Sequence, residues 1–488
     1  MNGKKSTAPF LLCAMLLLFI FTSCGTDAGE NEKAKENEKT NGEDAREKIT
    51  DAQDDLPESD FGGYDFRIYM RDYAVANADF YAENEVGEPL NDAVYNRNKK
   101  IGERFNINIE PVFYPNGEYD AASAQKSISA GDDVFDIAGV HGAGAFIMAG
   151  KNLALDWLEN MPYVNFDKPW WIDDIRKNFS AFGKLYCMAG DISHTGLAST
   201  GCMLFNKNLF ADLGIEYPYA DVTEGKWTLD KFMSLVRSYY ADLNGDGVMS
   251  VEDDRYGAEI RHEWDYPISV LYCGGDRVIA IGGDGTPELA VYNERTVDIF
   301  NKFFDMMNGE GAYLHIYSAS GEDYPTNTAF RAGRSLFYTT YLRDIVFHRD
   351  LEYEIGILPL PKYDVSTPKY YTNVDAGQNV FAVPVTSADT VRTSIIVEAL
   401  CAEGHYAIMP AFYEVSLKTK HARDNESSDM IDYIKDGRVY DYGYFNSSVA
   451  GNLAYTGRNL VMDKNPNFTS FYERESGKVQ ANIDALNK

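Results

Sequence analysis

The chain has 488 residues, of which 45% are apolar and 14% aromatic, so it can bury sizeable cores and is not a disordered protein. Its 75 acidic side chains against 45 Lys and Arg give a net charge of −30, which argues against binding to nucleic acid or anionic lipid. Residues 25–60 contribute −8 and residues 1–24 contribute +2, which leaves −24 on the remaining body. Six cysteines are too few for a disulfide scaffold of this length.

The first 25 residues have the pattern of an export signal. Lys4 and Lys5 precede twelve apolar residues at 10–21, a run that is too short to span a bilayer and suits a signal-peptide core. The run ends in Phe-Thr-Ser-Cys-Gly at 21–25, which resembles the bacterial lipobox. That resemblance implies a signal peptide at 1–23 and a palmitate-bearing, multiply acylated anchor on Cys24. An ordinary secretory signal with an incidental cysteine is the alternative.

A polar, acidic segment follows the predicted anchor. Residues 24–60 are rich in Gly, Asn, Glu, Lys and Asp and contain almost no apolar side chains, so they predict a solvated tether. Four cysteines remain in the body, without the spacing of a zinc site or a redox pair, and we expect them to be buried: Cys187, Cys202, Cys273 and Cys401.

Hydrophobic periodicity then alternates between strands and helices. We expect a strand at 61–70, a helix at 91–105, a strand from Ile107, a helix at 121–130 and a buried strand at 134–140. This alternation is typical of a largely parallel sheet with helices on both faces. Ligands of such sheets bind beyond the carboxyl ends of strands, so we expect the loop at 141–146 to face a ligand. A dinucleotide-binding turn is excluded there, because Ile147 stands where the third glycine is needed.

The alternation continues through the middle of the chain. Strand-like stretches at 183–190 and 201–205 precede a short helix at 206–214, and a longer helix begins at Trp227 with Thr228 as its N-cap. A strand is expected at 256–261. From about residue 376 onward the pattern is mainly helical, with a short strand at 380–385.

Residues 242–253 fit the pattern of a calcium-binding loop between that longer helix and the 256–261 strand. Oxygen ligands recur at positions 1, 3 and 5, glycine follows at position 6, and a backbone carbonyl is available at position 7. The predicted ligands of a structural calcium ion are Asp242, Asn244, Asp246, Val248, Ser250 and Asp253. A surface turn without an ion is the alternative.

Five stretches, at 136–140, 203–215, 225–232, 330–337 and 355–362, follow one another in an order that resembles a known family. That family comprises the extracellular solute-binding proteins (family 1) of carbohydrate-uptake ABC transporters, which include maltose-binding proteins. The resemblance implies an α/β, periplasmic-binding-protein-like fold with two lobes, each a mixed or parallel sheet flanked by helices, and a ligand cleft at the hinge.

The resemblance also implies domain boundaries. Lobe 1 would comprise 61–195 with 376–430, and lobe 2 would comprise 196–356 with 431–488, including the loop at 242–253. A hinge crossing would cover 357–375, and an earlier crossing would lie near 192–200.

Sugars offer apolar faces to aromatic rings and hydroxyls to polar side chains, so tryptophans beside polar residues are candidate ligand contacts. Trp170 and Trp171 lie in a polar stretch, and we expect one of them to face the cleft, with helix packing as the alternative. Trp264 and Asp265 follow the strand at 256–261 and suit a pocket wall.

The resemblance adds further cleft-lining positions. They are His141 after the 134–140 strand, Ser199 and Thr200 in the first crossing, Tyr341 and Arg343 after the 330–337 stretch, and Asp375 in the second crossing. For Arg343, a local ion pair with Asp344 is the alternative.

Together these patterns predict a receptor that captures a sugar or oligosaccharide for import. It would be lipid-anchored on the outer face of the cytoplasmic membrane of a bacterium of the Gram-positive type, and would deliver its ligand to ABC-transporter permease subunits. No catalytic motif is found: His262-Glu263 lacks the second histidine of a metalloprotease site, and no nucleophile elbow or phosphate-binding loop occurs. An oligopeptide-binding receptor and a secreted glycan-active enzyme are the alternatives.

Overall fold

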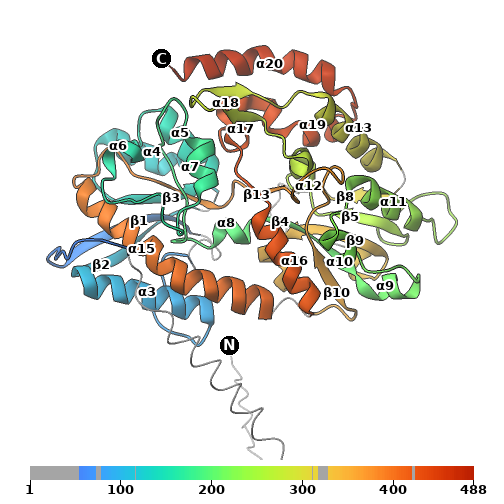
Figure 1. Cartoon of the computed structure of the whole chain (residues 1–488), viewed down its shortest axis with the longest axis horizontal. Helices are drawn as coiled ribbons and strands as arrows, with labels where there is room; N and C mark the ends of the chain where they lie inside the picture. Colours follow the sequence, from blue (N-terminus) through green and yellow to red (C-terminus); the bar gives the residue numbers. More distant parts are fainter. Residues whose placement is uncertain are drawn as a thin grey trace, which may run out of the picture. The chain divides into compact units, whose positions relative to one another are not determined.

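Two β-sheets, each covered by helices, organise the part of the chain that the computed structural model describes (Figure 1). The described residues are 54–72, 79–115, 117–309, 311–316, 328–419 and 424–487. Contacts group residues 52–488 into one compact unit. The predicted signal peptide, the lipidation site Cys24 and the tether up to residue 53 lie outside the described residues.

The sheet of the first lobe has the strand order β12-β3-β1-β2. β1 (Tyr64–Asp72) is parallel to β2 (Ile107–Pro115) and to β3 (Ile137–His141), whereas β12 (Asn379–Ala382) is antiparallel to β3. The strands expected near 61, 107, 134 and 380 are therefore confirmed, although β3 begins three residues later than predicted.

Helices cover both faces of this sheet. The helix predicted at 91–105 is α3 (Pro89–Phe105), and its first turn is capped by the Glu88 carboxylate. Its periodic apolar residues Val94, Ile101 and Phe105 are buried as the spacing predicts. Three further helices complete the lobe: α4 (Ala122–Ala130), α5 (Gly142–Gly150) and α15 (Thr390–Pro410).

The helix α15 packs along α3 at the base of the first lobe. The stretch Thr390–Val415 is long and apolar enough to cross a membrane, but 67% of its most apolar window is buried inside the unit. A helix that is apolar on all sides is expected where most of its surface is buried, so we interpret α15 as a core helix.

The sheet of the second lobe has the strand order β10-β4-β9-β5-β8. The central strand β9 (Ser335–Tyr341) is antiparallel to β4 (Gly201–Asn206) and parallel to β5 (Tyr256–Ile260). The outer strands are β10 (Ile355–Leu358), antiparallel to β4, and β8 (Ala312–Leu314), parallel to β5. Each lobe thus contains a mixed sheet.

Several helices cover the second sheet. The helix predicted after Trp227 is α11 (Leu229–Tyr239), whose N-cap Thr228 accepts a hydrogen bond from the Lys231 N–H, as expected. The short helix predicted at 206–214 is α9 (Lys207–Asp212), and α13 (Glu294–Asn308) lies further along the chain. In contrast, the stretch 183–190 forms only isolated bridges rather than a strand.

Short elements connect these larger ones. They are α6 (Trp157–Asn160), α7 (Asp173–Phe179), α8 (Thr195–Ala198), α10 (Tyr219–Thr223), α12 (Tyr266–Ser269), η1 (Val270–Gly274), β6 (Ile279–Ile281), β7 (Pro287–Leu289), α14 (Thr328–Arg331), η2 (Leu342–His348), β11 (Thr372–Asn373), η3 (Ala411–Thr419), β13 (Arg438–Val439), α17 (Tyr442–Phe445), α18 (Ser447–Ala450) and η4 (Gly451–Tyr455).

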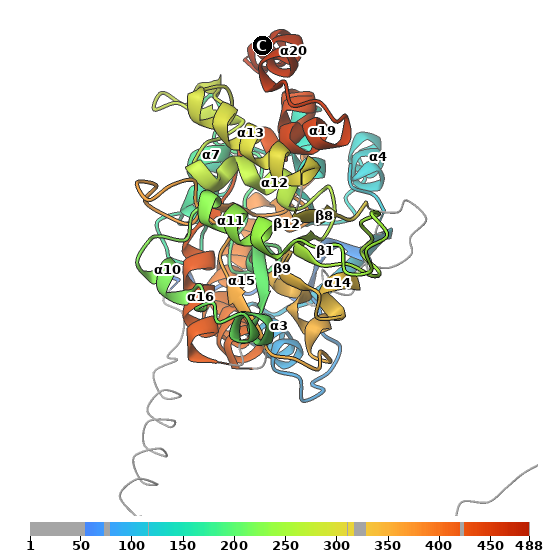
Figure 2. The ribbon, with the colours of Figure 1, turned by 90° about the vertical axis from the view of Figure 1, so that its right-hand side faces the viewer.

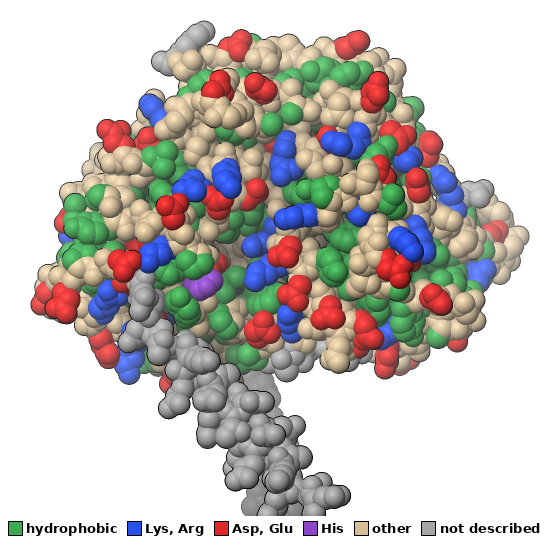
Figure 3. All heavy atoms as spheres, in the orientation of Figure 1, with side chains coloured by type: hydrophobic (Ala, Val, Ile, Leu, Met, Phe, Trp, Pro, Cys, Tyr) green, Lys and Arg blue, Asp and Glu red, His purple; other side chains and the backbone are tan. Residues whose placement is uncertain are grey.

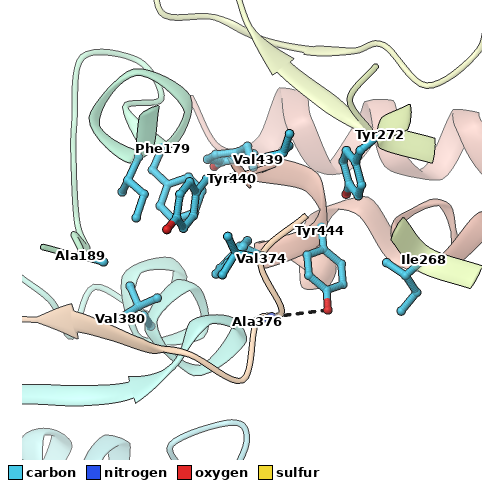
Figure 4. Close-up of a cluster of buried hydrophobic side chains, with 14 of the residues drawn as sticks. Phe179, Ala189, Ile268, Tyr272, Val374, Ala376, Val380, Val439, Tyr440 and Tyr444 are labelled. Atoms are coloured by element: carbon cyan, nitrogen blue, oxygen red, sulfur yellow. Dashed lines mark hydrogen bonds between the residues drawn. The ribbon is translucent and has the colours of Figure 1, made fainter. Parts of the chain in front are cut away.

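Three segments cross between the sheets and lie side by side. Thr200 of the first crossing bridges Val374 of the second, and β11 of the second crossing pairs in parallel with β13 of the third. Apolar side chains of the second and third segments, among them Val374, Val439 and Tyr444, belong to one buried cluster (Figure 4). The paired residues are Thr200 with Val374 and Thr372–Asn373 with Arg438–Val439.

The return to the second lobe occurs before residue 430, where the sequence placed it. The helix α16 (Asn425–Asp436) already packs on β10 of the second sheet. The C-terminal helices α19 (Thr456–Met462) and α20 (Phe468–Ala485) pack against α13 of the same lobe, and these three helices lie together in both ribbon views (Figures 1 and 2).

The predicted tether ends earlier than residue 60. The carboxylate of Asp54 is buried and forms an ion pair with Arg104 of α3, and Asp55 pairs with Lys168 at 2.6 Å. Residues 54–60 therefore belong to the folded unit. On the face shown in Figure 3, Asp and Glu are interspersed with Lys and Arg, so the excess acid is not gathered there into one patch.

Candidate functional site

Polar side chains from both lobes and two crossings gather where the strands β3, β5 and β9 end. We call this group the junction cluster; its members are Ser199, Arg261, His262, Asp265, Tyr341, Arg343, Asp344, Asp375 and Tyr444, with His141 at its edge. Most are buried, and the His262 Nε2 lies 2.9 Å from the Arg261 Nη1.

Arg343 joins two of the crossings to the end of β9. Its Nη1 donates a hydrogen bond to Ser199 Oγ at 2.6 Å, and its Nη2 lies 3.9 Å from Asp375 Oδ1. Its Nε is also 3.8 Å from Asp344 Oδ1. The structure therefore brings together three predicted site residues, and the local pair with Asp344 exists beside these contacts rather than instead of them.

The carboxylate of Asp375 is the centre of the cluster. Its Oδ2 accepts hydrogen bonds from the hydroxyls of Tyr444 at 3.2 Å and Tyr341 at 3.4 Å, and its Oδ1 accepts one from the Gly377 N–H at 2.9 Å. Burial raises the pKa of Asp375, but Arg343 and the other cations and donors around it outweigh burial and hold the pKa below its usual value. The group is therefore ionised near neutral pH.

Tyr341, which the resemblance placed at the cleft, does not offer an open ring on which a ligand could stack. Its side chain is 1% exposed, and the guanidiniums of Arg343 and Arg261 lie 4.4 and 5.0 Å from the ring centroid. Arg261 also pairs with Asp344 at 3.1 Å. Tyr341 therefore helps to position the cluster through its hydroxyl and ring, and the expected stacking on a ligand is not supported by this arrangement.

His141 ends β3 and caps the helix α5. Its Nδ1 accepts a hydrogen bond from the Ala143 N–H at 3.1 Å. Burial, and then the charge of Arg71, lower its pKa to about 4, so the imidazole is neutral and its second nitrogen is protonated at neutral pH. The side chain can thus donate one hydrogen bond at the edge of the cluster.

The glycine after His141 is required by packing. The Gly142 N–H donates to the Ala376 carbonyl at 2.8 Å, and a Cβ at this position would lie 2.3 Å from the Phe445 ring. The glycine therefore permits a close approach of the first lobe to Phe445 and to the second crossing at Ala376.

Trp264 and Asp265 lie in the loop after β5, as predicted. Trp264 is 37% exposed; the Arg458 guanidinium lies 3.8 Å from its ring centroid, and the Tyr455 ring meets it edge-on at 5.4 Å. Asp265 is only 2% exposed. Trp264 is the predicted tryptophan that the structure places at an accessible position beside the cluster.

Trp170 and Trp171 lie elsewhere, which corrects the prediction that one of them faces the cleft. Both are buried in the first lobe, where their indole N–H groups donate to the two oxygens of Glu398 in α15, at 2.9 and 2.8 Å. The Trp157 ring packs edge-on against Trp171. The alternative, that these tryptophans pack inside the lobe, is therefore the one observed. Their indole N–H groups bind the Glu398 carboxylate, which itself lies inside the core.

Thr200 also makes no contact with the cluster. Its hydroxyl donates to the Gly196 carbonyl at 3.0 Å, within its own turn, and its side chain is fully buried. Ser199 is the member of the predicted pair that reaches Arg343.

Several cluster members were not predicted as site residues, and neither was Arg71, which contacts the second crossing. Arg71 lies in β1 near its carboxyl end and donates to the Gly377 carbonyl, so the rule that ligands bind at strand ends could have identified it. Arg261 and Asp344 flank predicted residues in the same way. No sequence pattern indicates Tyr444, which comes from the far C-terminal region.

The predicted calcium loop is a series of tight turns between α11 and β5. The Asp242 carboxylate accepts hydrogen bonds from the N–H groups of Gly245 at 2.6 Å and Gly247 at 2.9 Å, and Asp246 accepts one from Val248 at 2.7 Å. Asp254, which the motif does not include, is buried and accepts from Leu243 and Ser250, both at 2.8 Å. Among the described residues, no three His, Cys, Asp or Glu side chains are grouped closely enough to hold a metal ion.

A surface pocket of about 480 Å³ lies away from the junction cluster. Residues 54–56 and 162–167 line it together with Arg176, all in the first lobe. None of these residues belongs to the cluster, and the predicted site residues converge on the cluster instead. We therefore take the junction cluster as the candidate site.

No protein-family model matches the chain, and no curated protein matches it in sequence. Solved structures match over most of its length. UspC from M. tuberculosis is 12% identical with a TM-score of 0.55, and the match covers 85% of this chain and 99% of that one. A cyclic α-maltosyl-1,6-maltose binding protein from Arthrobacter globiformis is 13% identical with a TM-score of 0.54, over 86% and 99%.

The GacH receptor of Streptomyces glaucescens, which was solved alone and with acarbose, is 11% identical with a TM-score of 0.51, over 87% and 97%. Similarity at these identities shows the fold. The predicted two-lobed, periplasmic-binding-protein-like α/β fold is therefore confirmed, with a mixed sheet in each lobe.

Proposed function

We propose that this protein is a non-enzymatic receptor that binds a sugar or oligosaccharide between its two lobes for import by an ABC transporter. The observation that carries the proposal is the junction cluster, because it combines side chains from the strand ends of both lobes with side chains on the crossings. A ligand bound there would contact both lobes and would favour the arrangement in which they meet.

The chemistry of the cluster suits a hydroxyl-rich ligand. Arg343, Asp375 and Asp265 offer donors and acceptors, and the partly exposed ring of Trp264 offers an apolar face. The fold neighbours support the same class, since one is described as a binding protein for a cyclic maltosyl-maltose and another was solved with acarbose.

The anchoring and localisation rest on the N-terminal sequence. A signal peptide at 1–23, lipidated Cys24 and the acidic segment that follows would hold the folded unit outside the cytoplasmic membrane of a bacterium of the Gram-positive type. From there the receptor would deliver its ligand to the permease subunits of the transporter.

A structural calcium ion in the 242–253 loop forms part of the proposal. The turns of this loop wrap residues 242–248 around the Asp242 carboxylate, as a loop that supplies oxygens at positions 1, 3 and 5 requires. The ion would be held by Asp242, Asn244, Asp246, Val248, Ser250 and Asp253, and it would fix the connection between α11 and β5.

The proposal is tested by a thermal-shift screen of the purified folded unit, followed by calorimetry. The panel contains maltotriose, acarbose, other neutral oligosaccharides and a matched set of tri- to penta-peptides. We expect at least one oligosaccharide to raise the melting temperature and no peptide to do so. Peptide shifts without sugar shifts would overturn the carbohydrate assignment, and hydrolysis of any bound sugar would overturn the non-enzymatic one.

A further inference from the structure

One carboxylate of the junction cluster differs from its neighbours in having no partner. Asp375 accepts three hydrogen bonds, and Asp344 forms an ion pair with Arg261 at 3.1 Å, although its buried Oδ2 accepts no hydrogen bond. Asp265 is 2% exposed, and no residue that the structure describes donates a hydrogen bond or forms an ion pair with its side chain. Its Oδ2 is fully buried without a partner.

A structural role would normally account for an aspartate at this position. Asp265 is the N-cap of α12, where a carboxylate usually accepts a backbone N–H from the first turn. Here its side chain makes no such bond, and the first turn is held instead by the Asp265 carbonyl, which accepts from the Ile268 and Ser269 N–H groups. The carboxylate is therefore not used to stabilise the helix.

We propose that Asp265 is an unfilled hydrogen-bond acceptor for the ligand, and that the ligand-free protein is less stable because its carboxylate is buried without a donor. This inference rests on the proposed function, since it assigns the donor to the bound molecule. A buried acceptor without a partner costs stability, whereas a ligand hydroxyl placed on it satisfies the acceptor. Binding and stability thus place opposite demands on this residue.

The surroundings restrict what can fill the position. Arg261 on the same loop is paired with Asp344, and Arg343 is held by Ser199 and Asp375, so both guanidiniums are already engaged by other side chains. A ligand carboxylate placed next to Asp265 would be repelled, whereas hydroxyl or ammonium groups would be accepted. The site therefore selects neutral or amino sugars and rejects uronates.

The charge state of Asp265 follows from the same environment. Burial raises its pKa to about 7, an increase that Arg261 partly offsets. The titratable and charged groups that face it come from the β5 loop, β9, η2, the second crossing and β4: Arg261, Tyr338, Tyr341, Arg343, Asp344, Asp375 and Cys202. A hydroxyl donor favours the ionised form, so filling the site near pH 7 releases a proton.

The decisive experiment needs no ligand. Melting temperatures of the wild type, D265N and the matched variant D344N are measured in ligand-free protein from pH 5 to pH 8. We expect D265N to melt about 2–3 °C above the wild type at pH 8 and by a smaller margin at pH 5, because the wild type loses stability progressively between the unfolded-state pKa of aspartate and the folded-state pKa of about 7. D344N removes a paired carboxylate and should melt below the wild type throughout.

If D265N melts below the wild type at pH 8, as D344N should, Asp265 has a structural partner and the inference is wrong. A second measurement uses maltotriose and the corresponding trigalacturonate in calorimetry at pH 7, in two buffers of different ionisation enthalpy. Proton release on maltotriose binding that D265N abolishes supports the inference, and tighter binding of trigalacturonate contradicts it. Failure of every sugar to bind would overturn the proposed function, while the melting comparison still decides the role of Asp265.

Discussion

Arg343 and Ser199 are 144 residues apart in the sequence, yet the Arg343 Nη1 lies 2.6 Å from the Ser199 Oγ. The same guanidinium is 3.9 Å from Asp375, so one side chain after β9 connects the first and second crossings. A conformational change at the crossings would therefore alter the position of this side chain together with the ligand contacts. Arg343 couples the hinge to the candidate site.

Substitution of Arg343 tests this coupling. In R343A the partly buried Asp375 loses its main cation, and we expect the free energy of unfolding to fall by about 1–2 kcal/mol, together with a loss of sugar binding. R343K keeps the charge, but a single ammonium cannot reach Ser199 and Asp375 with the geometry of the guanidinium fork, so it should keep stability better than binding. Denaturant unfolding and calorimetry measure both quantities. Wild-type binding in R343A would show that the cluster is not the ligand site.

Gly142 tests the contact between the first lobe and the second crossing. We expect G142A to lose about 1–3 kcal/mol of stability, because its Cβ would lie 2.3 Å from the Phe445 ring. Gly150 at the end of the same helix provides the control, since a Cβ there has no atom within 4 Å. G150A should leave stability unchanged or raise it by up to about 1 kcal/mol. Equal effects of the two substitutions in chemical denaturation would contradict the packing argument.

Glu398 makes the first lobe sensitive to pH. Burial raises its pKa to about 7, although Trp171, the Asn165 N–H and Trp170 donate to it and oppose the rise. The folded-state pKa exceeds the unfolded one, so the protonated form stabilises the fold at low pH, and this stabilisation is lost as the pH rises through 7. Between pH 5 and pH 8 the wild type should lose up to about 3 kcal/mol more than E398Q.

The comparison with E398Q isolates this residue, because every other group, Asp265 included, titrates in both proteins. Unfolding curves at each pH give the difference in free energy. Parallel pH profiles for the two proteins would mean that Glu398 stays ionised in the core throughout this range.

A calcium ion bound in the 242–253 loop should raise the melting temperature of the protein. Addition of EDTA should lower it by a few degrees, and excess Ca²⁺ should restore it. D253N is the informative variant, because the Asp253 side chain is exposed and makes no hydrogen bond in the described structure. It should melt like the wild type in EDTA but gain less from Ca²⁺. A wild-type melting temperature that EDTA leaves unchanged would argue against the ion.

The predicted anchoring of the protein to the membrane depends on Cys24. C24A should abolish lipid modification and move the protein from the membrane fraction to the soluble fraction or the medium. C13A is the matched control, since Cys13 lies within the apolar run of the signal and should not affect anchoring. Fractionation after labelling with a palmitate analogue measures both. Continued membrane association of unlabelled C24A would reject the lipobox.

Local patterns in the sequence sufficed for much of the fold. The apolar period of 3.6 residues at Val94, Ile101 and Phe105 predicts α3, and the alternation around Ile107 predicts β2, because burying one face of an element depends on neighbours a few residues away. The order of these elements, with the five family-like stretches, was enough to predict the two-lobed α/β class. The site residues His141 and Arg343 were predicted from the family resemblance rather than from such local patterns.

The tertiary structure decided which of the candidate side chains meet. Trp170 and Trp171 stand in a polar stretch, yet they pack inward because Glu398, more than 220 residues later, requires their indole N–H groups. Tyr444 joins Asp375 across 69 residues without any local signal, and Asp265 stays unpaired because its neighbours' cations are already held by Asp344, Ser199 and Asp375. A sequence shows which groups seek partners, but only the packing of distant segments determines which partners remain within reach.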